Sequence, residues 1–394
     1  MSRPNRGLAA AVTGLALLFS IPAVNAEILA IGIDRKFAYD DQAKRQALAP
    51  GRDEVLFYDL KVPTSPLLIG SLALENSIVG PPTNIAITPD ERFALVANAL
   101  RSVRSDDGQS WKAAPADDVH VVDLAQRPPK LIKTIKVGLQ PSGIAINRDG
   151  TLALVANRAG NSISVIEIKG GDVVVKDTIA MTESVVSVAF TPDGRRALAA
   201  KFNGHKIAIL DVDGAGRVTY TGRDLPVGLY PWTVTIAPDG TTALVTNIGA
   251  GAASDGNAKT VSVIDLTGNP IRVSQHISVG DAPEGVTVSP DGKMAAITVL
   301  QGSYDAPKGA WYRNERGLVS LIALSRKQAK VMTSREVGAF PEGIAFSANG
   351  RVLYVGNFAS ETLSILSLGN DGAITGVKEV KLPGPAASLR IGSR

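Results

Sequence analysis

The sequence PSGIAINRDGTLALVAN, which occupies residues 141–157, decides the fold because closely related sequences return along the chain. The other copies begin at Pro82, Val185, Pro231, Pro283 and Pro341, and the copy from Val185 is the most degenerate. Successive copies start 59, 44, 46, 52 and 58 residues apart, so the unit is about 45 residues long, with insertions in some copies. A repeat of this length is typical of the four-stranded blade of a β-propeller.

Each copy predicts a hairpin followed by two further strands. In the copy quoted above, short apolar strands at 144–146 and 152–156 flank Asp149-Gly150, where glycine supplies the positive φ that a tight turn needs. An alternating third strand follows, as in ISVIEI at Ile163, and a more variable outer strand ends the unit. The first strand carries a small residue at its middle, as expected where blades crowd toward a central axis. These small residues are Ala86, Ala145, Ala189, Thr235, Thr287 and Ala345.

The two ends of the chain supply the parts of a seventh blade. Six full copies end near Leu382, and PGPAASLRI at Pro383 resembles one more innermost strand with nothing after it. Near the other end, ILAIGI at Ile28, VLFYDL at Val55 and LLIGSLAL at Leu67 match the second, third and outer strands. We therefore predict one all-β domain over residues 27–394, a seven-bladed propeller of four-stranded antiparallel blades. Its last blade joins the C-terminal strand to three N-terminal strands, which leaves no free sheet edge.

Residues 1–26 have the pattern of a secretory signal peptide. Arg3 and Arg6 precede an apolar run at 8–19, and the small-residue pattern Val24-Asn25-Ala26 follows it. The apolar run is shorter than the roughly 20 residues that a membrane-spanning helix needs. We expect export, to the periplasm or outside the cell, with no membrane span after cleavage.

The composition of the 394 residues excludes several kinds of chemistry. The chain has no Cys, which excludes disulfides, thiolate metal sites, thiol nucleophiles and covalent haem attachment. Its net charge of +4 gives no excess for binding nucleic acid. With only three His, we expect no histidine metal centre and no cofactor. The alternative is a calcium ion on carboxylate and Asn oxygens at the channel mouth, although no EF-hand spacing supports it.

The second-strand endings carry a resemblance to a known family. ALVAN at 94–98 and 153–157, ALVTN at 243–247 and LYVGN at 353–357 each follow a turn like Pro-Asp-Gly. These endings resemble the YVTN β-propeller repeat family over essentially the whole chain after residue 26. The resemblance implies a secreted or surface propeller, related in architecture to lactonase-type propellers and to the propeller subunits of periplasmic quinoprotein amine dehydrogenases. It implies no single activity, because propellers carry many functions.

Positions that recur in every copy are expected to serve the blade, whereas departures are candidates for function. The Asn that ends the second strand recurs at 98, 157, 247 and 357, and we expect it to bond the backbone of the following loop. By contrast, the residue after each repeat Pro varies, and these residues should ring the mouth of the central channel. They are Thr83, Ser142, Val186, Trp232, Glu284 and Glu342.

The candidate catalytic residues are two carboxylates and two basic groups. Glu284 and Glu342 occupy equivalent positions in adjacent blades and are candidate acid/base groups or metal ligands. Lys201 and His205 depart from the repeat in the third blade and could supply a cation and a base for opening a lactone. The alternative is structural: solvated carboxylates at the rim, an exposed Lys and a turn His.

Aromatic and arginine side chains on the long loops are the candidate ligand- or partner-binding residues, because such side chains often anchor interfaces. They are Trp111, Trp232, Tyr304, Trp311, Tyr312 and Arg313.

These patterns support three hypotheses about function. The first is an exported binding module that takes a protein partner or a small polar ligand on its long-loop face. The second is a lactonase-type hydrolase or isomerase acting on a cyclic ester at the channel mouth. The third, prompted by the resemblance alone, is a propeller subunit of a periplasmic redox complex. We expect a monomer, and whether the protein is an enzyme stays open at this point.

Overall fold

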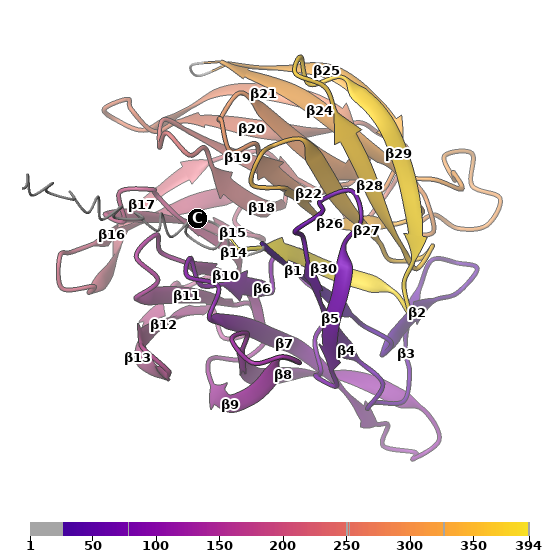
Figure 1. The fold of residues 1–394 in the computed structure, drawn as a ribbon, viewed down its shortest axis with the longest axis horizontal. Coiled ribbons are helices and arrows are strands. Elements are labelled where there is room, and N and C mark those ends of the chain that lie inside the picture. Colours follow the sequence, from indigo (N-terminus) through magenta and orange to yellow (C-terminus); the bar gives the residue numbers. More distant parts are fainter. Residues whose placement is uncertain (1–26, 78, 250, 252, 326–327, 393–394) are drawn as a thin grey trace, which may run out of the picture.

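The protein is a closed ring of seven four-stranded antiparallel sheets in its computed structural model (Figure 1). The structure describes residues 27–392 except 78, 250, 252 and 326–327. Within them there is no α-helix, and no helical segment has the length and apolarity to cross a membrane. The predicted signal peptide, residues 1–26, lies outside the described residues. The predicted fold class is confirmed.

Six blades follow one another along the chain, each ordered from the innermost to the outermost strand. Blade 1 contains β6 (Ile85–Ile87), β7 (Phe93–Arg104), β8 (Trp111–Asp123) and β9 (Lys130–Lys136). Blade 2 contains β10 (Pro141–Ile146), β11 (Leu152–Asn157), β12 (Ser162–Lys169) and β13 (Asp172–Ala180). Blade 3 contains β14 (Val185–Phe190), β15 (Arg196–Lys201), β16 (Lys206–Val212) and β17 (Val218–Pro226).

The remaining sequential blades have the same order. Blade 4 contains β18 (Pro231–Ile236), β19 (Thr242–Asn247), β20 (Lys259–Asp265) and β21 (Arg272–Gly280). Blade 5 contains β22 (Pro283–Val288), β23 (Met294–Val299), β24 (Leu318–Ser325) and β25 (Gln328–Glu336). Blade 6 contains β26 (Pro341–Phe346), β27 (Val352–Asn357), β28 (Thr362–Leu368) and β29 (Ile374–Lys381).

Blade 7 closes the ring with strands from both ends of the chain, as predicted. It contains β30 (Ala386–Ile391), β1 (Ile28–Ile33), β4 (Glu54–Asp59) and β5 (Leu67–Leu72). The innermost strand β30 pairs with β1, with Leu389 opposite Ile31, and Figure 1 shows yellow β30 beside indigo β1. Between β1 and β4 the chain forms a separate hairpin of β2 (Phe37–Tyr39) and β3 (Arg45–Ala47).

The core is divided among the interfaces between adjacent blades. For example, Leu29 of blade 7 and Tyr354 of blade 6 are fully buried in one cluster, because the facing sheets are apolar on both sides. The cluster between blades 3 and 4 is larger, since it continues across one end of the channel to Phe37, Phe340 and Phe358. We call that end the upper face; it carries the connections that lead into each innermost strand. The opposite, lower face carries the Asp-Gly turns.

The recurring Asn is structural, but its partners differ from those we expected. The Nδ2 group of Asn157 donates to the hydroxyls of Ser162 and Ser164 on the third strand, each at 3.0 Å, rather than to the loop backbone. Asn247 and Asn357 make the same pair of bonds. A Cβ atom at Gly138 would lie 2.5 Å from the Asn157 Nδ2, so only glycine fits beside this Asn.

Candidate functional site

The upper mouth of the channel is built from two repeated positions in each blade. The residue after the second strand donates its backbone N–H to the residue before the innermost strand, as in Arg158 N to Gln140 O at 2.9 Å. Phe358 makes the same bond to Phe340 O at 2.8 Å. The varied residue that follows each repeat Pro lies beside this bond. In blades 2 to 6, the repeat therefore brings one residue of each kind to the upper mouth of the channel.

Glu284 and Glu342 are held in equivalent ways between neighbouring blades. The hydroxyl of Thr246 donates to the backbone oxygen of Glu284 at 2.8 Å, and that of Thr298 to the backbone oxygen of Glu342 at 2.9 Å. A Cβ atom at Gly285 would lie 2.6 Å from Glu342 O, so glycine permits this close approach of the blades. Both carboxyl groups consequently project from rigid innermost strands.

Both carboxyl groups are buried, so they are not the solvated rim carboxylates of the structural alternative. Glu284 is 5% exposed and Glu342 2% exposed, and the Oε2 atom of each has no hydrogen-bond partner among the described residues. Burial raises the pKa of Glu284 to about 8, and the nearby Asp305 charge adds to the rise against the opposing effects of Trp232 and Arg158. Burial and the Glu284 charge raise the pKa of Glu342 well above its usual range. Burial therefore favours the protonated form of both carboxyl groups.

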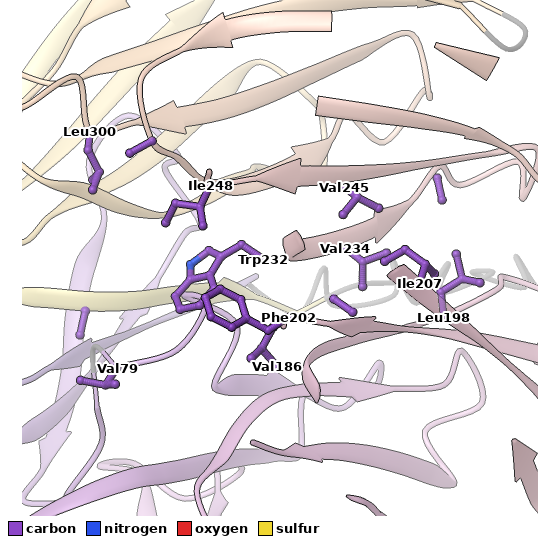
Figure 2. Close-up of a cluster of buried hydrophobic side chains, with 14 of the residues drawn as sticks. Val79, Val186, Leu198, Phe202, Ile207, Trp232, Val234, Val245, Ile248 and Leu300 are labelled. Carbon is purple, nitrogen blue, oxygen red and sulfur yellow. The ribbon is translucent and has the colours of Figure 1, made fainter. Parts of the chain in front are cut away.

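A cation packed on aromatic rings adjoins the carboxyl pair. The Arg158 guanidinium lies 4.8 Å from the Phe202 ring centre and 5.3 Å from that of Trp232. These two rings are themselves in contact, with centres 5.2 Å apart, as Figure 2 shows. Burial and the Arg45 charge lower the pKa of Arg158 to about 10, while the Glu284 charge acts in the other direction. Arg158 is thus a cation at neutral pH, in an aromatic setting that strengthens its interactions.

The β2–β3 hairpin covers this site. Phe37 is buried in the upper cluster, and the Tyr39 ring centre lies 5.4 Å from that of Phe340 and 5.7 Å from that of Tyr304. Burial raises the pKa of Tyr39, and the charges of Glu342 and Glu284 contribute to the rise, which places Tyr39 near both carboxyls. The hairpin therefore separates the carboxyl pair from solvent.

A third carboxyl group lies beside the pair. Asp305 accepts the backbone N–H of Ser254 at 2.7 Å through Oδ2, and its Oδ1 has no hydrogen-bond partner among the described residues. Burial, assisted by the Asp281 charge, raises the pKa of Asp305 to about 6. It follows that this end of the channel gathers three buried acids.

Lys201 and His205 do not lie with the carboxyl pair. Lys201 is 1% exposed and donates to Asp224 at 2.9 Å and to the Tyr220 hydroxyl at 3.0 Å. The Nδ1 atom of His205 accepts the Tyr230 backbone N–H at 3.0 Å, which leaves this His at the edge of the aromatic cluster. The structure gives both residues local structural partners.

The loop aromatics divide into two groups. Tyr304 joins the site through its contacts with Tyr39 and Phe340. Trp311 is 82% exposed and touches Tyr312, with ring centres 5.5 Å apart. Arg313 donates to the backbone oxygen of Ala306, and Trp111 lies under Arg104 near the end of the β7–β8 hairpin. Trp311, Tyr312 and Arg313 lie on the loop between β23 and β24, and Trp111 begins strand β8, so none of them joins the carboxyl site.

Sequence reasoning missed Arg158 and the covering hairpin. The internal repeat contains a signal for Arg158, because the residue that follows the position of the recurring Asn is apolar in the other five sequential blades. Those residues are Ala99, Phe202, Ile248, Leu300 and Phe358. Nothing in the repeat could place Tyr39 over Glu342, since the hairpin has no counterpart in the sister blades.

Within the described residues, no group of three or more His, Asp or Glu side chains has an arrangement that could hold a metal ion. The calcium alternative therefore gains no support from them. That the protein needs no cofactor stays a prediction.

Comparison with solved structures yields lactonase-like relatives in fold. A putative 6-phosphogluconolactonase from Bacteroides uniformis has a TM-score of 0.69 at 14% identity, over 93% of this chain and 99% of that one. The periplasmic gluconolactonase of Pseudomonas aeruginosa has a TM-score of 0.65 at 19% identity, over 93% and 98%. Hydrazine synthase of Kuenenia stuttgartiensis has a TM-score of 0.58 at 20% identity, over 80% and 91%. No protein-family pattern and no curated protein sequence matches the chain. At these identities, the similarity shows a shared propeller fold.

Proposed function

We propose that the upper site catalyses acid–base chemistry on a small polar cyclic ester, as a lactonase does. The observation that carries this proposal is the pair of buried carboxyl groups, Glu284 and Glu342, which share one site without a counter-ion bonded to either. Burying unpaired acids costs stability, and strongly raised pKa values cluster at functional sites. Catalysis at neutral pH is the use that such groups best suit.

The two acids have complementary roles in ring opening. Glu284, whose pKa is about 8, is ionised in a fraction of the molecules at neutral pH, and this ionised form is the general base that takes a proton from an attacking water. Glu342, whose pKa burial and the Glu284 charge raise well above its usual range, gives its proton to the ring oxygen as the C–O bond breaks. The product is a hydroxy acid. A proton then passes from Glu284 to Glu342, which restores both groups.

Arg158 stabilises the negatively charged intermediate that forms when water attacks the ester. Water attack on the ester carbonyl places a negative charge on its oxygen, and a fixed cation with few competing bonds stabilises such a charge. The Phe202 and Trp232 rings hold the Arg158 guanidinium in place.

Substrate entry requires displacement of the β2–β3 hairpin, because both carboxyls are almost fully covered. Such a displacement would break the bond from Lys308 N–H to Asp41 O, at 2.7 Å, and the ring contacts of Tyr39 with Tyr304 and Phe340. Lids of this kind exclude water from the reaction.

The comparisons support the substrate class without fixing it. Two of the similar folds carry lactonase names, and their sequence identities of 14% and 19% are too low to transfer an activity.

A panel of aldonolactones and aliphatic lactones, assayed by acid release at constant pH, tests the proposal. We expect turnover by the wild-type protein and its loss in Glu284→Gln and in Glu342→Gln, with both variants folded. Glu361→Gln is the matched control, because this acid pairs with Lys381 on the upper side of blade 6 outside the site. Absence of turnover for every lactone, or unchanged rates in both site variants, would reject the proposal.

A second candidate is the binding of a protein partner by the loop between β23 and β24. The observation in its favour is Trp311, whose 82% exposure is the highest among the exposed large hydrophobic side chains in the described residues. Substituting Trp311, Tyr312 and Arg313 with Ser should reduce capture of a partner from the exported fraction while lactone turnover stays unchanged. Capture that is unaffected would remove this candidate. The resemblance to hydrazine synthase adds no residue to either function.

We also propose that the protein acts after export, because residues 1–26 match a signal peptide. Cell fractionation, with sequencing of the mature N-terminus, tests this: a protein retained in the cytoplasm with residues 1–26 would exclude it.

A further inference from the structure

The lower half of the channel contains a cavity of about 590 Å³. The innermost strands of all seven blades line it, together with turn residues such as Pro192 and Pro238. Arg148, which is exposed on the lower face, also lines it, so the cavity reaches solvent there. The charged residues of its lining are Glu27, Arg148 and Arg390, which gives an excess of one positive charge.

Arg390 occupies a position of the innermost strand at which the other six blades have a small residue. It is the fifth residue of the six-residue strand β30, just as Ala345 is the fifth residue of β26. In the other blades the same position holds Ala86, Ala145, Ala189, Thr235 or Thr287, and all of these line the cavity. Six small side chains leave space around the axis, and a single long cation enters that space from blade 7.

The contacts of Arg390 leave most of its hydrogen-bonding capacity unused. Its Nε–H donates to Ile85 O of blade 1 at 3.2 Å, and no ion pair joins it to a carboxylate of the described residues. Burial lowers the pKa of Arg390. A guanidinium has five N–H donors in a planar fork, and the other four make no hydrogen bond to a described residue. Arg390 itself lines the cavity.

Two threonine hydroxyl groups of the cavity lining also have unused hydrogen-bonding capacity. The Oγ1 atoms of Thr83 and Thr233 are buried, have no hydrogen-bond partner among the described residues, and belong to residues that line the same cavity. Thr83 is 8% exposed and Thr233 1% exposed. Buried polar groups normally have partners, which a bound ligand or water would supply here.

We propose that the lower channel is a binding site for a small oxyanion, a carboxylate or phosphate group, held by the Arg390 guanidinium with help from the threonine hydroxyls. Arginine suits this role because its fork matches two oxygens of either group at once. The volume admits a molecule the size of a small di- or tricarboxylate or a sugar phosphate. The site uses neither the three buried acids nor Arg158 of the upper site, although Thr83 holds the repeat position of Glu284 and Glu342, so it does not depend on the proposed lactonase activity.

The competing explanation is that Arg390 only fastens blade 7 to blade 1 through Ile85 O. The repeat itself supplies the variant that separates the two, because Arg390→Ala places the residue of four sister blades at this position. A fastening role predicts a lower melting temperature and no anion binding. An anion site predicts loss of binding in a folded protein.

Calorimetric titration of the mature chain with inorganic phosphate and, separately, with malonate and citrate tests the proposal. We expect saturable binding of at least one of these anions to the wild-type protein. Arg390→Ala should weaken that binding at least about 30-fold, the size of effect expected for a lost charge-assisted bidentate contact. Arg390→Lys should bind at an intermediate level, since it keeps the charge without the fork. If phosphate binds and the carboxylates do not, the site is a phosphate site; the reverse result makes it a carboxylate site.

Two controls make the result decisive. Arg148→Ala removes a cation from the cavity mouth only and should change the affinity by less than about threefold. Glu284→Gln should leave anion binding unchanged, whatever it does to lactone turnover. The proposal is wrong if no anion binds the wild-type protein below about 10 mM, or if Arg390→Ala and Arg390→Lys bind as tightly as wild type. If Arg390→Ala does not fold, Arg390→Lys decides between the two explanations.

Discussion

Two clusters of buried ionisable side chains lie on the upper side of this propeller. They differ in whether those side chains are paired with one another. In blade 3, Lys201 is bonded to Asp224 and Tyr220, and Tyr220 is bonded in turn to Asp224 at 2.7 Å. At the channel, Glu284 and Glu342 have side-chain oxygens without any described partner. In the blade 3 cluster the buried polar groups have hydrogen-bond partners. In the channel cluster, carboxyl oxygens remain that could accept hydrogen bonds from a ligand.

The pKa shifts express the same contrast. Desolvation favours the neutral form of both Lys201 and Asp224, yet their mutual hydrogen bonds outweigh it, so the pKa of Lys201 is raised and that of Asp224 lowered. Desolvation is not outweighed at the channel, where the pKa values of both Glu residues rise. The ionised forms of Lys201 and Asp224 are favoured, as in a structural ion pair. The neutral forms of Glu284 and Glu342 are favoured, which is typical of a candidate catalytic site.

The largest effect we expect is on catalysis. Glu284→Gln keeps the size of the side chain and removes its ability to accept a proton, so turnover of the best lactone should fall about 10³-fold, or roughly 4 kcal/mol in transition-state stabilisation. Steady-state kinetics of the purified variant measures this. A loss below about threefold would mean that the unpaired acids of the channel are as structural as the paired charges of blade 3.

The next effect is on stability, in blade 3. Lys201→Met leaves Asp224 and Tyr220 without their buried partner and should lower the free energy of unfolding by about 3 kcal/mol, as for other broken buried pairs. Lactone turnover at a temperature where the variant is folded should be unchanged. Urea denaturation measures the free energy of unfolding. A change below about 0.5 kcal/mol would show that the Lys201 network does not stabilise blade 3.

The two clusters should also respond oppositely to pH. The folded pKa of Glu284 exceeds its unfolded value of 4.5, so its contribution to stability is complete below pH 4.5 and declines as the pH rises to about 8. The folded pKa of Asp224 lies below 3.8, so its contribution is present above that pH and declines as the pH falls through the folded value.

Melting curves from pH 3 to 9 distinguish these contributions. Glu284→Gln combined with Glu342→Gln should flatten the decline above pH 4.5, and Lys201→Met should alter only the acid limb. A wild-type protein equally stable at pH 5 and pH 8, with no change in the double variant, would show that the channel acids are not held protonated.

The smallest effect is expected at the exposed loop. Trp311→Ser should change the free energy of unfolding by no more than about 0.5 kcal/mol, because the side chain is 82% exposed. Thermal denaturation measures this. A larger loss of stability would show that packing of Trp311 against Gly256 stabilises the fold, which would weaken the second candidate function.

The repeat predicted most of the fold because a blade is a local unit. Each hairpin and third strand is encoded within about 45 residues, and the unmatched strands at Ile28 and Pro383 were enough to predict the closing blade. The same comparison of copies singled out Glu284, Glu342 and Trp232, which do lie together at the channel. It also singled out Lys201, whose departure from Asn has a structural explanation in Asp224 and Tyr220.

By itself, the sequence determined the seven blades, their closure and the equivalence of Glu284 with Glu342, since these depend on periodicity along the chain. Only the tertiary structure decided whether those acids are solvated or buried. The covering hairpin β2–β3 belongs to blade 7, yet it packs on residues of blades 5 and 6 that lie far away in sequence. The tertiary structure also decided that Arg390 lies beside a space left by six small side chains. That space exists only when all seven innermost strands surround one axis. Burial and the pairing of charges are properties of such distant contacts, and no local pattern encodes them.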